Sequence, residues 1–462
     1  MVGALAKTLA RLGHEVALVT PLYAGTARRF PDLHRLDYQL ELPLGPANPK
    51  GSVFTLQPAD RLTIYFVDQP EFYNRPELYH QNGVDYPDNA ARFLFLCKAA
   101  VDLARKLPFQ PEVVHVHDWQ SGFVPLLIHH LTKTEGWGNA PATCITLHNL
   151  AYQGVFPPTL YSLSNLPWDY FNPSGVEFYG KMNFLKAGIA FSNSITTVSP
   201  RYAREITTEA MGCGLDGLLR ARQSSLIGIL NGADYSEWNA QADHFIQQPF
   251  SAENFEGKAA NKAALQKEFG LPVDSSLPLF GSIGRLVEQK GVDILLGALE
   301  EMLGTGLQFV LIGTGHSKFE AAFLDLSRRY PHQVSVRIAF SQAMAHRVEA
   351  GCDFFLMPSH FEPCGLNQMY SLRYATIPIV RATGGLDDTV IDATEDAERA
   401  DGIKFGEFSS RALAKAIRKG LVLFGEPEVL RRFRVNAMAA DFRWDSTAQG
   451  YLEAYERAMK QA

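Results

Sequence analysis

Residues 279–293 read LFGSIGRLVEQKGVD. The stretch opens with a short apolar run, passes through a loop punctuated by glycines and continues into a segment with helical spacing. A strand that leads through a tight loop into a helix is the repeating unit of a parallel α/β sheet. The stretch therefore predicts an α/β domain of the nucleotide-binding type in the second half of the chain.

The same alternation of short apolar runs and helical segments extends through both halves of the chain. In the second half the predicted strands are 279–283, 308–312, 334–338, 354–357 and 377–380. In the first half they are 15–20, 62–67, 113–117, 143–147 and 194–198, with a helix over 89–106 among them. We predict an α/β fold with two doubly wound, Rossmann-like domains of parallel sheet that face each other across a ligand cleft.

The length of the chain, 462 residues, also favours two domains, because single hydrophobic cores stop growing at roughly 250 to 300 residues. A boundary is indicated where LNGAD, residues 230–234, ends a strand with turn residues and a polar stretch follows. We place an N-terminal domain at 1–240 and a C-terminal domain at 241–445. We expect an amphipathic helix over 446–462 to pack back on the first domain.

The composition excludes several classes of protein. Hydrophobic residues make up 46% and charged residues 20%, as in ordinary globular proteins. A net charge of -6 without a dense run of Lys and Arg argues against a nucleic-acid partner. The five cysteines contain no C-x-x-C pair, which argues against a disulfide framework or a zinc site. No apolar stretch is long enough to span a membrane. We expect a cytoplasmic protein.

Two cations, Arg285 and Lys290, lie in the glycine-punctuated loop of the opening stretch. A guanidinium offers a rigid fork and an ammonium a point charge, so together they can neutralise a leaving nucleoside diphosphate. Cations near a helix start are usually plain surface residues, but the position of these two at the end of a strand favours a ligand site.

A second strand, loop and helix unit carries PSHFEPCGLNQ at 358–368. The backbone amides of Gly365, Leu366 and Asn367 are predicted to lie at a helix N-terminus, where phosphate binds. Glu362 precedes the helix and could approach a sugar at its reacting carbon, or could be an ordinary helix-start carboxylate. For Cys364 the simpler interpretation is a residue without a role in the chemistry.

The third such loop contains Thr383, Gly384 and Gly385, whose glycines permit close approach of the backbone to a ligand. A dinucleotide fingerprint is also suggested at Gly313, which follows a strand. The third glycine position of that fingerprint is Lys318, so a dinucleotide-dependent oxidoreductase is excluded.

In the first half, HVHDW at 115–119 and TLHNLAYQG at 146–154 each end an apolar strand. Polar clusters at strand ends indicate a sugar site. The three histidines His115, His117 and His148 could suggest a metal ion, but their spacing matches no ligand pattern and hydrogen-bonded histidines are commoner. We therefore expect no metal site.

Taken together, the phrases GRLVEQKG, HFEPCGLNQ, TGGLDDTV, HDW and LHNLAYQG resemble those of bacterial glycogen synthases and plant starch synthases, and the likeness covers nearly the whole chain. The resemblance implies the GT-B fold. It also implies transfer of glucose from ADP-glucose to the non-reducing end of an α-1,4-glucan such as glycogen, with retention of configuration and without a metal or other cofactor.

The resemblance also assigns roles to residues. Arg285 and Lys290 resemble the pair that binds the diphosphate, Glu362 the carboxylate near the transferred glucose, and His148 with Asp118 the lining of the acceptor side. The implied catalytic residues are Glu362, His148, Arg285 and Lys290. The implied substrate-binding residues are Asp118, Asn149, Asn231, Cys364, Gly365, Leu366, Asn367, Thr383, Gly384 and Gly385.

Two departures from the wider pattern stand out. Tyr370 occupies the place where many related transferases carry a second glutamate that holds the ribose, a departure that the glycogen synthase branch shares. The family begins with a strand and a lysine loop of the form K-x-G-G-L-x-D before a helix that reads V-V-G-A-L, whereas this chain opens with MVGAL. We expect a start further upstream. Without that strand we expect exposed sheet edges and poor folding.

Two alternatives to this function remain. One is a GT-B transferase that uses another nucleotide or another acceptor. The other is a catalytically impaired glucan-binding protein, because the lysine loop, which contacts the donor phosphate in the family, has no counterpart in this sequence.

Overall fold

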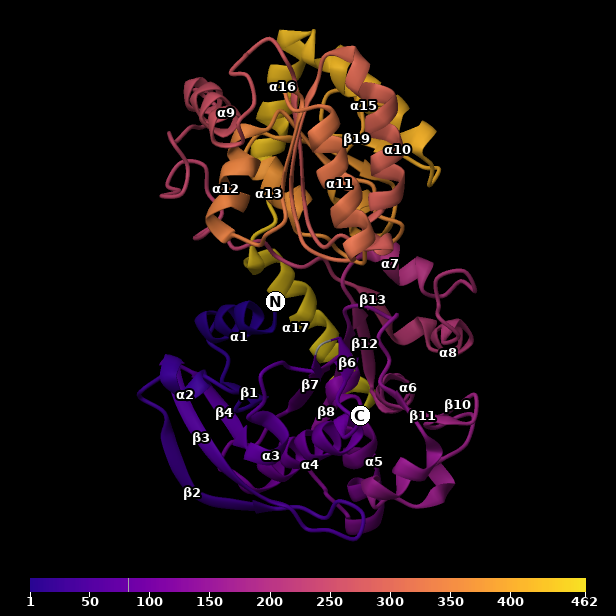
Figure 1. Cartoon of the computed structure of the whole chain (residues 1–462). Coiled ribbons are helices and arrows are strands. Elements are labelled where there is room, and N and C mark those ends of the chain that lie inside the picture. Colours follow the sequence, from indigo (N-terminus) through magenta and orange to yellow (C-terminus); the bar gives the residue numbers. More distant parts are fainter. Residues whose placement is uncertain (82) are drawn as a thin grey trace. The chain divides into compact units, whose positions relative to one another are not determined.

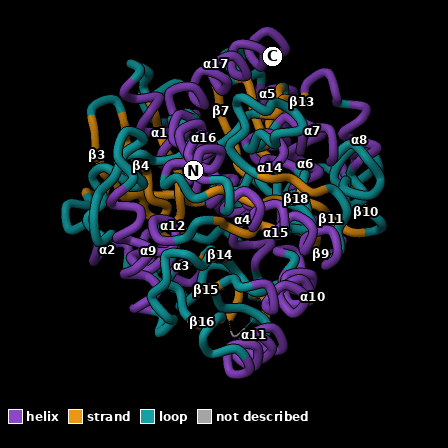
Figure 2. The backbone as a smooth tube through the Cα atoms, turned by 90° about the horizontal axis from the view of Figure 1, so that it is seen from above, coloured by secondary structure: helices purple, strands orange, loops and turns teal. Residues whose placement is uncertain are grey.

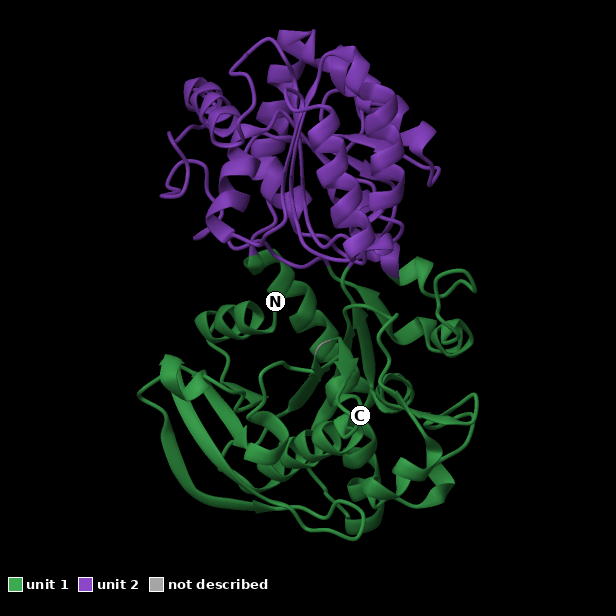
Figure 3. Ribbon diagram, viewed as in Figure 1, with its two compact units in different colours: residues 1–198, 203–229, 444–462 green, residues 199–202, 230–443 purple. Residues whose placement is uncertain are grey.

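The computed structural model describes residues 1–81 and 83–462, which form two compact units (Figures 1 and 3). Unit 1 comprises 1–198, 203–229 and 444–462. Unit 2 comprises 199–202 and 230–443. The chain leaves unit 1 before residue 240, because the segment after Leu230 packs on unit 2. There Ala233 N donates to Phe442 O at 2.7 Å.

The core of unit 2 is a six-stranded parallel sheet in the order β16-β15-β14-β17-β18-β19. Its strands are β14 (Leu279–Ile283), β15 (Gln308–Ile312), β16 (Val334–Arg337), β17 (Phe354–Met357), β18 (Ile377–Arg381) and β19 (Ile403–Phe405). Side chains alternate between the faces, so Phe280 joins the core cluster of α10 and α15 while Leu279 joins that of α9 and α12. Burial on both faces explains why these strands read as continuous apolar runs.

Helices cover both faces of this sheet, with α10, α11 and α15 on one side and α9 and α12 on the other (Figure 1). The helices of unit 2 are α9 (Glu256–Glu268), α10 (Val292–Met302), α11 (Ser317–Arg329), α12 (Gln342–Gly351), α13 (Asn367–Arg373), α14 (Gly384–Thr389), α15 (Ser410–Phe424) and α16 (Pro427–Ala439). The result is the doubly wound arrangement that the sequence predicts.

Unit 1 contains two separate four-stranded sheets. One is parallel, in the order β13-β12-β8-β7, and consists of β7 (Val113–His117), β8 (Ala142–Leu147), β12 (Ser194–Thr197) and β13 (Leu226–Gly228). The other has the order β1-β4-β3-β2 and consists of β1 (Val16–Pro21), β2 (His34–Glu41), β3 (Lys50–Ala59) and β4 (Leu62–Asp68). Among the described strands, β1 and β7 each lie at the edge of their sheet.

The β2-β3-β4 part of unit 1 is antiparallel and differs from the parallel sheet that the sequence predicts. Strand β2 is exposed at alternate positions and carries polar residues there, so it shows no continuous apolar run. Strands β2 and β3 were therefore not predicted, whereas β4 coincides with the predicted strand 62–67.

Helices α4, α5 and α6 of unit 1 pack against one another beside the parallel sheet. The helices of this unit are α1 (Val2–Arg11), α2 (Thr26–Arg29), α3 (Pro70–Tyr73), α4 (Asn89–Lys106), α5 (Val124–Glu135), α6 (Phe184–Phe191) and α8 (Asp216–Ala221), and α7 (Pro200–Glu205) crosses the boundary between the units. The short strands are β5 (His80–Gln81), β6 (Val84–Asp85), β9 (Val155–Phe156), β10 (Glu177–Phe178) and β11 (Lys181–Asn183).

The expected C-terminal helix is α17 (Trp444–Gln461), and it packs within unit 1. Its apolar stripe buries Ala448 and Tyr451 against Leu5 and Leu9 of α1. The helix also lies along β7 and β8, and the view from above shows it next to β7 (Figure 2). No helix in the described part of the chain has both the length and the apolar character needed to cross a membrane.

Two loops of unit 2 meet at Gly291, which follows the loop after β14. Its φ is +66°, and a Cβ there would lie 2.0 Å from Pro358 O in the loop after β17. The contact continues where His360 N donates to Gln289 O at 2.9 Å. Only glycine fits this position without moving one backbone away from the other.

The substitution Gly291→Ala should therefore destabilise unit 2. Strain and displacement together should cost about 2 kcal/mol, which lowers the melting temperature by roughly 4 to 8 °C. Gly304→Ala is the matched control, because a Cβ there meets nothing within 4 Å. Thermal unfolding of both variants measures the difference, and equal melting temperatures would contradict the assigned contact.

Candidate active site

The loops that follow β14 and β17 are joined by an ion pair at the carboxyl end of the sheet in unit 2. Lys290 Nζ donates to Glu362 Oε2 at 2.5 Å, and Ser359 Oγ donates to the same oxygen at 3.1 Å. The Glu362 side chain is 8% exposed and that of Lys290 is 28% exposed. The two charged residues singled out in separate motifs are thus brought together, with the ammonium nearer the surface.

The charge balance of this pair matters for an anionic ligand. A buried carboxylate is stable only when it is paired and hydrogen-bonded, so Lys290 compensates Glu362 in the free chain. Arg285, five residues earlier in the same loop, is exposed and its guanidinium has no hydrogen-bonding partner among the described residues. Arg285 is therefore an exposed cation in the same loop as the neutral Lys290–Glu362 pair.

The third loop packs against the second through two glycines. A Cβ on Gly384, whose φ is +45°, would lie 2.0 Å from Glu362 O, and one on Gly385 would lie 2.1 Å from Cys364 O. Gly385 N also approaches Glu362 O at 3.1 Å. Thr383, just before them, is 2% exposed. These glycines bring backbone against backbone, so they fix the position of Glu362.

The start of α13 provides amides without a side-chain cap, since its N-cap is Leu366. Gly365, with φ of +71°, sets the turn into the helix. Asn367 directs its side chain inward, where Nδ2 donates to Ile283 O at 3.0 Å and ties the helix to β14. The side chain of Asn367 is thus already engaged.

Cys364, two residues after Glu362 in the same loop, contacts Asn231. Cys364 is 5% exposed, and burial raises the pKa of its thiol to about 12. This thiol therefore stays protonated and behaves as a packing residue. Asn231 is 9% exposed, and its Oδ1 is a buried acceptor without a partner in the described part of the chain. A hydroxyl of a ligand would satisfy it.

Tyr370, the departure from the wider pattern, belongs to a stack of three rings. Its ring lies parallel to Trp238 with 4.0 Å between centroids, and Trp238 stacks on His346 at 3.8 Å. His346 is fully buried, and its Nδ1 lies 2.7 Å from Asp243 Oδ2. Tyr370 therefore fastens the segment after Leu230 to unit 2.

One exposed aromatic residue at this edge of the sheet was not predicted. Phe340 lies just after β16 and is 86% exposed. An exposed phenyl ring offers a flat apolar face to a ligand. Its place after a predicted strand of the same sheet was the signal that could have identified it.

In unit 1 the ends of β7 and β8 are joined by Asp118 and His148. Asp118 Oδ1 accepts from the His148 backbone N–H at 2.7 Å. Asp118 has φ of +53°, an unfavourable conformation for a residue with a side chain. Burial raises the pKa of its carboxyl to about 7. The two motifs of the first half thus form one cluster.

The histidines of this cluster contact one another and neighbouring hydroxyl groups. His117 Nδ1 lies 3.2 Å from His148 Nε2, and His115 lies 2.8 Å from Tyr455 OH and 2.6 Å from Thr146 Oγ1. Burial lowers the pKa of His148 to about 4, that of His115 to about 3 and that of His117 well below its usual value. Within the described residues, no group of three His, Cys, Asp or Glu side chains is arranged to hold a metal ion.

Hydrogen bonds and close packing fix the conformation of the loop after β8. Asn149 Oδ1 accepts from Ala151 N at 3.1 Å, and Gln153 Nε2 donates to Leu150 O at 3.1 Å. Gly154, with φ of +62°, packs directly on the ring of Trp119, where a Cβ would approach a ring carbon to 2.4 Å. These contacts hold His148 and Asn149 in place.

Residues 1–221 match the family described as the starch synthase catalytic domain, and residues 265–437 match glycosyl transferases group 1. The chain belongs to the glycogen and starch synthase family. It is 46% identical to a glycogen synthase of Anaeromyxobacter sp. over 98% of this chain and 94% of that protein. It is 42% identical to glycogen synthase 2 of Nitrosococcus oceani over 99% of this chain and 93% of that protein. The chain is accordingly a glycosyltransferase.

The fold agrees with this membership. The catalytic domain of starch synthase IV from Arabidopsis thaliana, solved with ADP and acarbose, superposes with a TM-score of 0.89 at 32% identity. The match covers 99% of this chain and 95% of that one. A sucrose-phosphate synthase from Thermosynechococcus elongatus shares the fold with a TM-score of 0.61 at 15% identity. The predicted GT-B fold is confirmed.

The partly buried histidines of this cluster should make the stability of unit 1 sensitive to acid. Because the pKa of His115 is lowered in the folded state, the unfolded chain alone takes up that proton below about pH 6.5, so stability falls as pH falls from 6.5 toward 3. Between pH 7 and pH 5 the free energy of unfolding should therefore fall by about 1 to 2 kcal/mol less in His115→Gln than in wild type. His14→Gln, at an exposed position just after α1, is the control, and its stability should change with pH as that of wild type does. Urea unfolding at the two pH values tests this, and parallel losses in all three proteins would contradict it.

Proposed function

We propose that this chain transfers glucose from ADP-glucose to the non-reducing end of an α-1,4-glucan, with retention of configuration. The observation that carries the proposal is the Lys290–Glu362 pair, which sets a cation and a carboxylate side by side at the carboxyl ends of β14 and β17. Glycogen synthases as relatives, and a starch synthase structure that holds ADP and acarbose, support the choice of donor and acceptor.

The residues of unit 2 suit the nucleotide part of the donor. Arg285 and Lys290 would bind the two phosphates, and the uncapped amides at the start of α13 would add hydrogen bonds. Phe340 offers a face on which the base could stack. Charge that develops on the leaving diphosphate would then be stabilised by groups already in position, which is usually the largest part of catalysis.

Glu362 of unit 2 would hold the transferred sugar. In this mechanism the bond from the anomeric carbon to the diphosphate oxygen breaks, and the acceptor's 4-hydroxyl attacks from the same face and gives its proton to the departing phosphate. Glu362 would stabilise the positive charge that develops on the glucose ring. His148, which burial keeps neutral near pH 7, would hydrogen-bond a sugar hydroxyl, with Asp118 holding its backbone.

We propose further that the reaction needs no metal ion or other cofactor and takes place in the cytoplasm. The cationic groups Arg285 and Lys290 would take the role that a divalent ion plays in other nucleotide-sugar enzymes. The absence of a membrane-crossing helix among the described residues is compatible with this compartment.

The direct test is incorporation of labelled glucose into glycogen from ADP-glucose and, in parallel, from UDP-glucose, with and without EDTA. We expect faster transfer from ADP-glucose, no effect of EDTA, and release of the label as maltose by β-amylase, which cuts α-1,4 linkages from the non-reducing end. Preference for another donor would favour a different GT-B transferase. Binding of glycogen without transfer would favour the impaired glucan-binding protein.

Arg285 and Lys290 should contribute far more to catalysis than a neighbouring surface cation does. Arg285→Ala and Lys290→Ala should each lower kcat by about 100-fold, as expected for removal of one preorganised charge donor. Lys318→Ala is the matched control, because that lysine forms an exposed ion pair with Glu288 of the same loop at 2.6 Å. Steady-state kinetics and melting temperatures of the three variants provide the test. Unchanged turnover in Arg285→Ala or Lys290→Ala would refute the assignment.

A further inference from the structure

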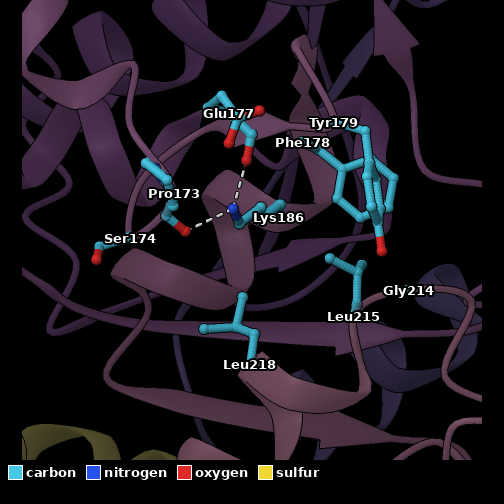
Figure 4. Close-up of a pocket in the computed structure, with 9 residues that line it drawn as sticks. All are labelled: Pro173, Ser174, Glu177, Phe178, Tyr179, Lys186, Gly214, Leu215 and Leu218. Carbon is cyan, nitrogen blue, oxygen red and sulfur yellow. Dashed lines mark hydrogen bonds between the residues drawn. The ribbon is translucent and has the colours of Figure 1, made fainter.

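A cavity of about 500 Å³ lies in unit 1, outside the motifs described above (Figure 4). The rings of Phe178 and Tyr179 stand on one side of it, Lys186 stands across from them, and Leu215 and Leu218 line another wall. The cavity thus combines an aromatic side with a polar side.

Tyr179 occupies its position at a cost to the fold. It forms with Gly180 the two-residue turn between β10 and β11, and both have positive φ, +50° and +77°. Such type I′ turns favour Asn, Asp or Gly, and a tyrosine there is strained. The side chain is also 80% exposed, so little burial offsets the strain. A strained and exposed aromatic residue points to a ligand and not to packing.

The polar side of the cavity is not an ion-binding site. Lys186 Nζ donates to Pro173 O at 2.7 Å and also to the Glu177 backbone carbonyl. Glu177 Oε1 accepts from Gly180 N at 2.6 Å. Both charged groups are therefore engaged in holding the cavity wall. What remains among the lining residues is the hydroxyl groups of Ser174 and Tyr179 and the aromatic rings, which suits a neutral ligand with an apolar face and hydroxyls of its own.

The aromatic rings are arranged as a corner. Phe178 and Tyr179 have centroids 4.7 Å apart and planes at 81°. Phe178 also borders Gly214, where a Cβ would come within 3.0 Å of its ring. One ring thus offers its face while the other closes the side of the site. The apolar face of a pyranose ring fits against such a surface, with its hydroxyls directed to the polar wall.

Strand pairing and hydrogen bonds connect the cavity wall to the loop after β8, which carries His148. Strand β11 pairs with β9, which directly follows the loop after β8. Asn183 Nδ2 donates to Gln153 Oε1 at 2.6 Å, and Gln153 Nε2 donates to Cys213 O at 3.0 Å. A polymer bound in the cavity would therefore be held by the same compact unit that carries His148.

We propose that this cavity is a second binding site for α-glucan, in which a glucose unit stacks on Tyr179. The proposal rests on the function proposed above, since the ligand is another segment of the polymer that accepts glucose. Binding of one branch in the cavity raises the effective concentration of other chain ends at the active site. Long or branched acceptors should gain from it, and short oligosaccharides should not.

The decisive variant is Tyr179→Asn, because asparagine is favoured in the turn and should keep or raise the melting temperature while it removes the ring. We expect its affinity for glycogen, measured by affinity electrophoresis, to fall about 3- to 10-fold. With glycogen as acceptor the apparent KM should rise, whereas kinetics with maltotriose should stay at the wild-type level. Tyr179→Phe keeps the ring and should keep the affinity.

Trp168→Ala is the matched control, since Trp168 is 57% exposed in the same unit but lies outside the cavity. It should bind glycogen as wild type does. Wild-type affinity in Tyr179→Asn, or an equal loss in Trp168→Ala, would overturn the proposal. Glycogen binding that depends on Tyr179 in a chain without transfer activity would refute the proposed function and leave this site standing.

Discussion

The ion pair between Lys290 and Glu362 is the interaction on which the candidate donor site depends. It joins two loops that belong to different strands, and it keeps a buried carboxylate compensated. These two loops can approach closely enough only because Gly291 has no side chain, since a Cβ there would meet Pro358 O at 2.0 Å. The loop after β18 packs on the backbone of Glu362 for the same reason, since a Cβ on Gly384 would meet Glu362 O at 2.0 Å. Glycine at these positions is thus a condition for the charge arrangement at the site.

Unit 1 follows the same logic with different chemistry. Asp118 adopts an unfavourable backbone conformation in which its carboxyl group reaches the backbone of His148, and the partly buried histidines around it are neutral. Backbone strain and the burial of polar groups both lower the stability of the fold. In return, the polar groups of this cluster have fixed positions before any substrate binds. Groups that need not reorganise stabilise charge more effectively than mobile ones. Tyr179, which lines the cavity in Figure 4, likewise has a strained backbone conformation.

The sequence predicted most closely the parts that are buried on both faces. Strands β14, β15 and β17 begin and end where the apolar runs do, because the parallel sheet leaves no solvated side. The antiparallel β2 and β3 were not predicted, because exposed polar residues interrupt their pattern. The glycine loops identified the chemistry of the site, but not that Gly384 contacts the Glu362 backbone. The exposure of Tyr179 depends on the tertiary fold, so no local pattern could reveal it.

The most direct test of this account is a crystal structure of the chain with ADP. We predict that the phosphate oxygens lie within hydrogen-bonding distance of the Arg285 guanidinium and Lys290 Nζ, with Glu362 still held by Ser359. The amides at the start of α13 should face the same phosphates. A diphosphate bound away from the loops after β14 and β17, or those loops without bound ADP at saturating concentration, would contradict it.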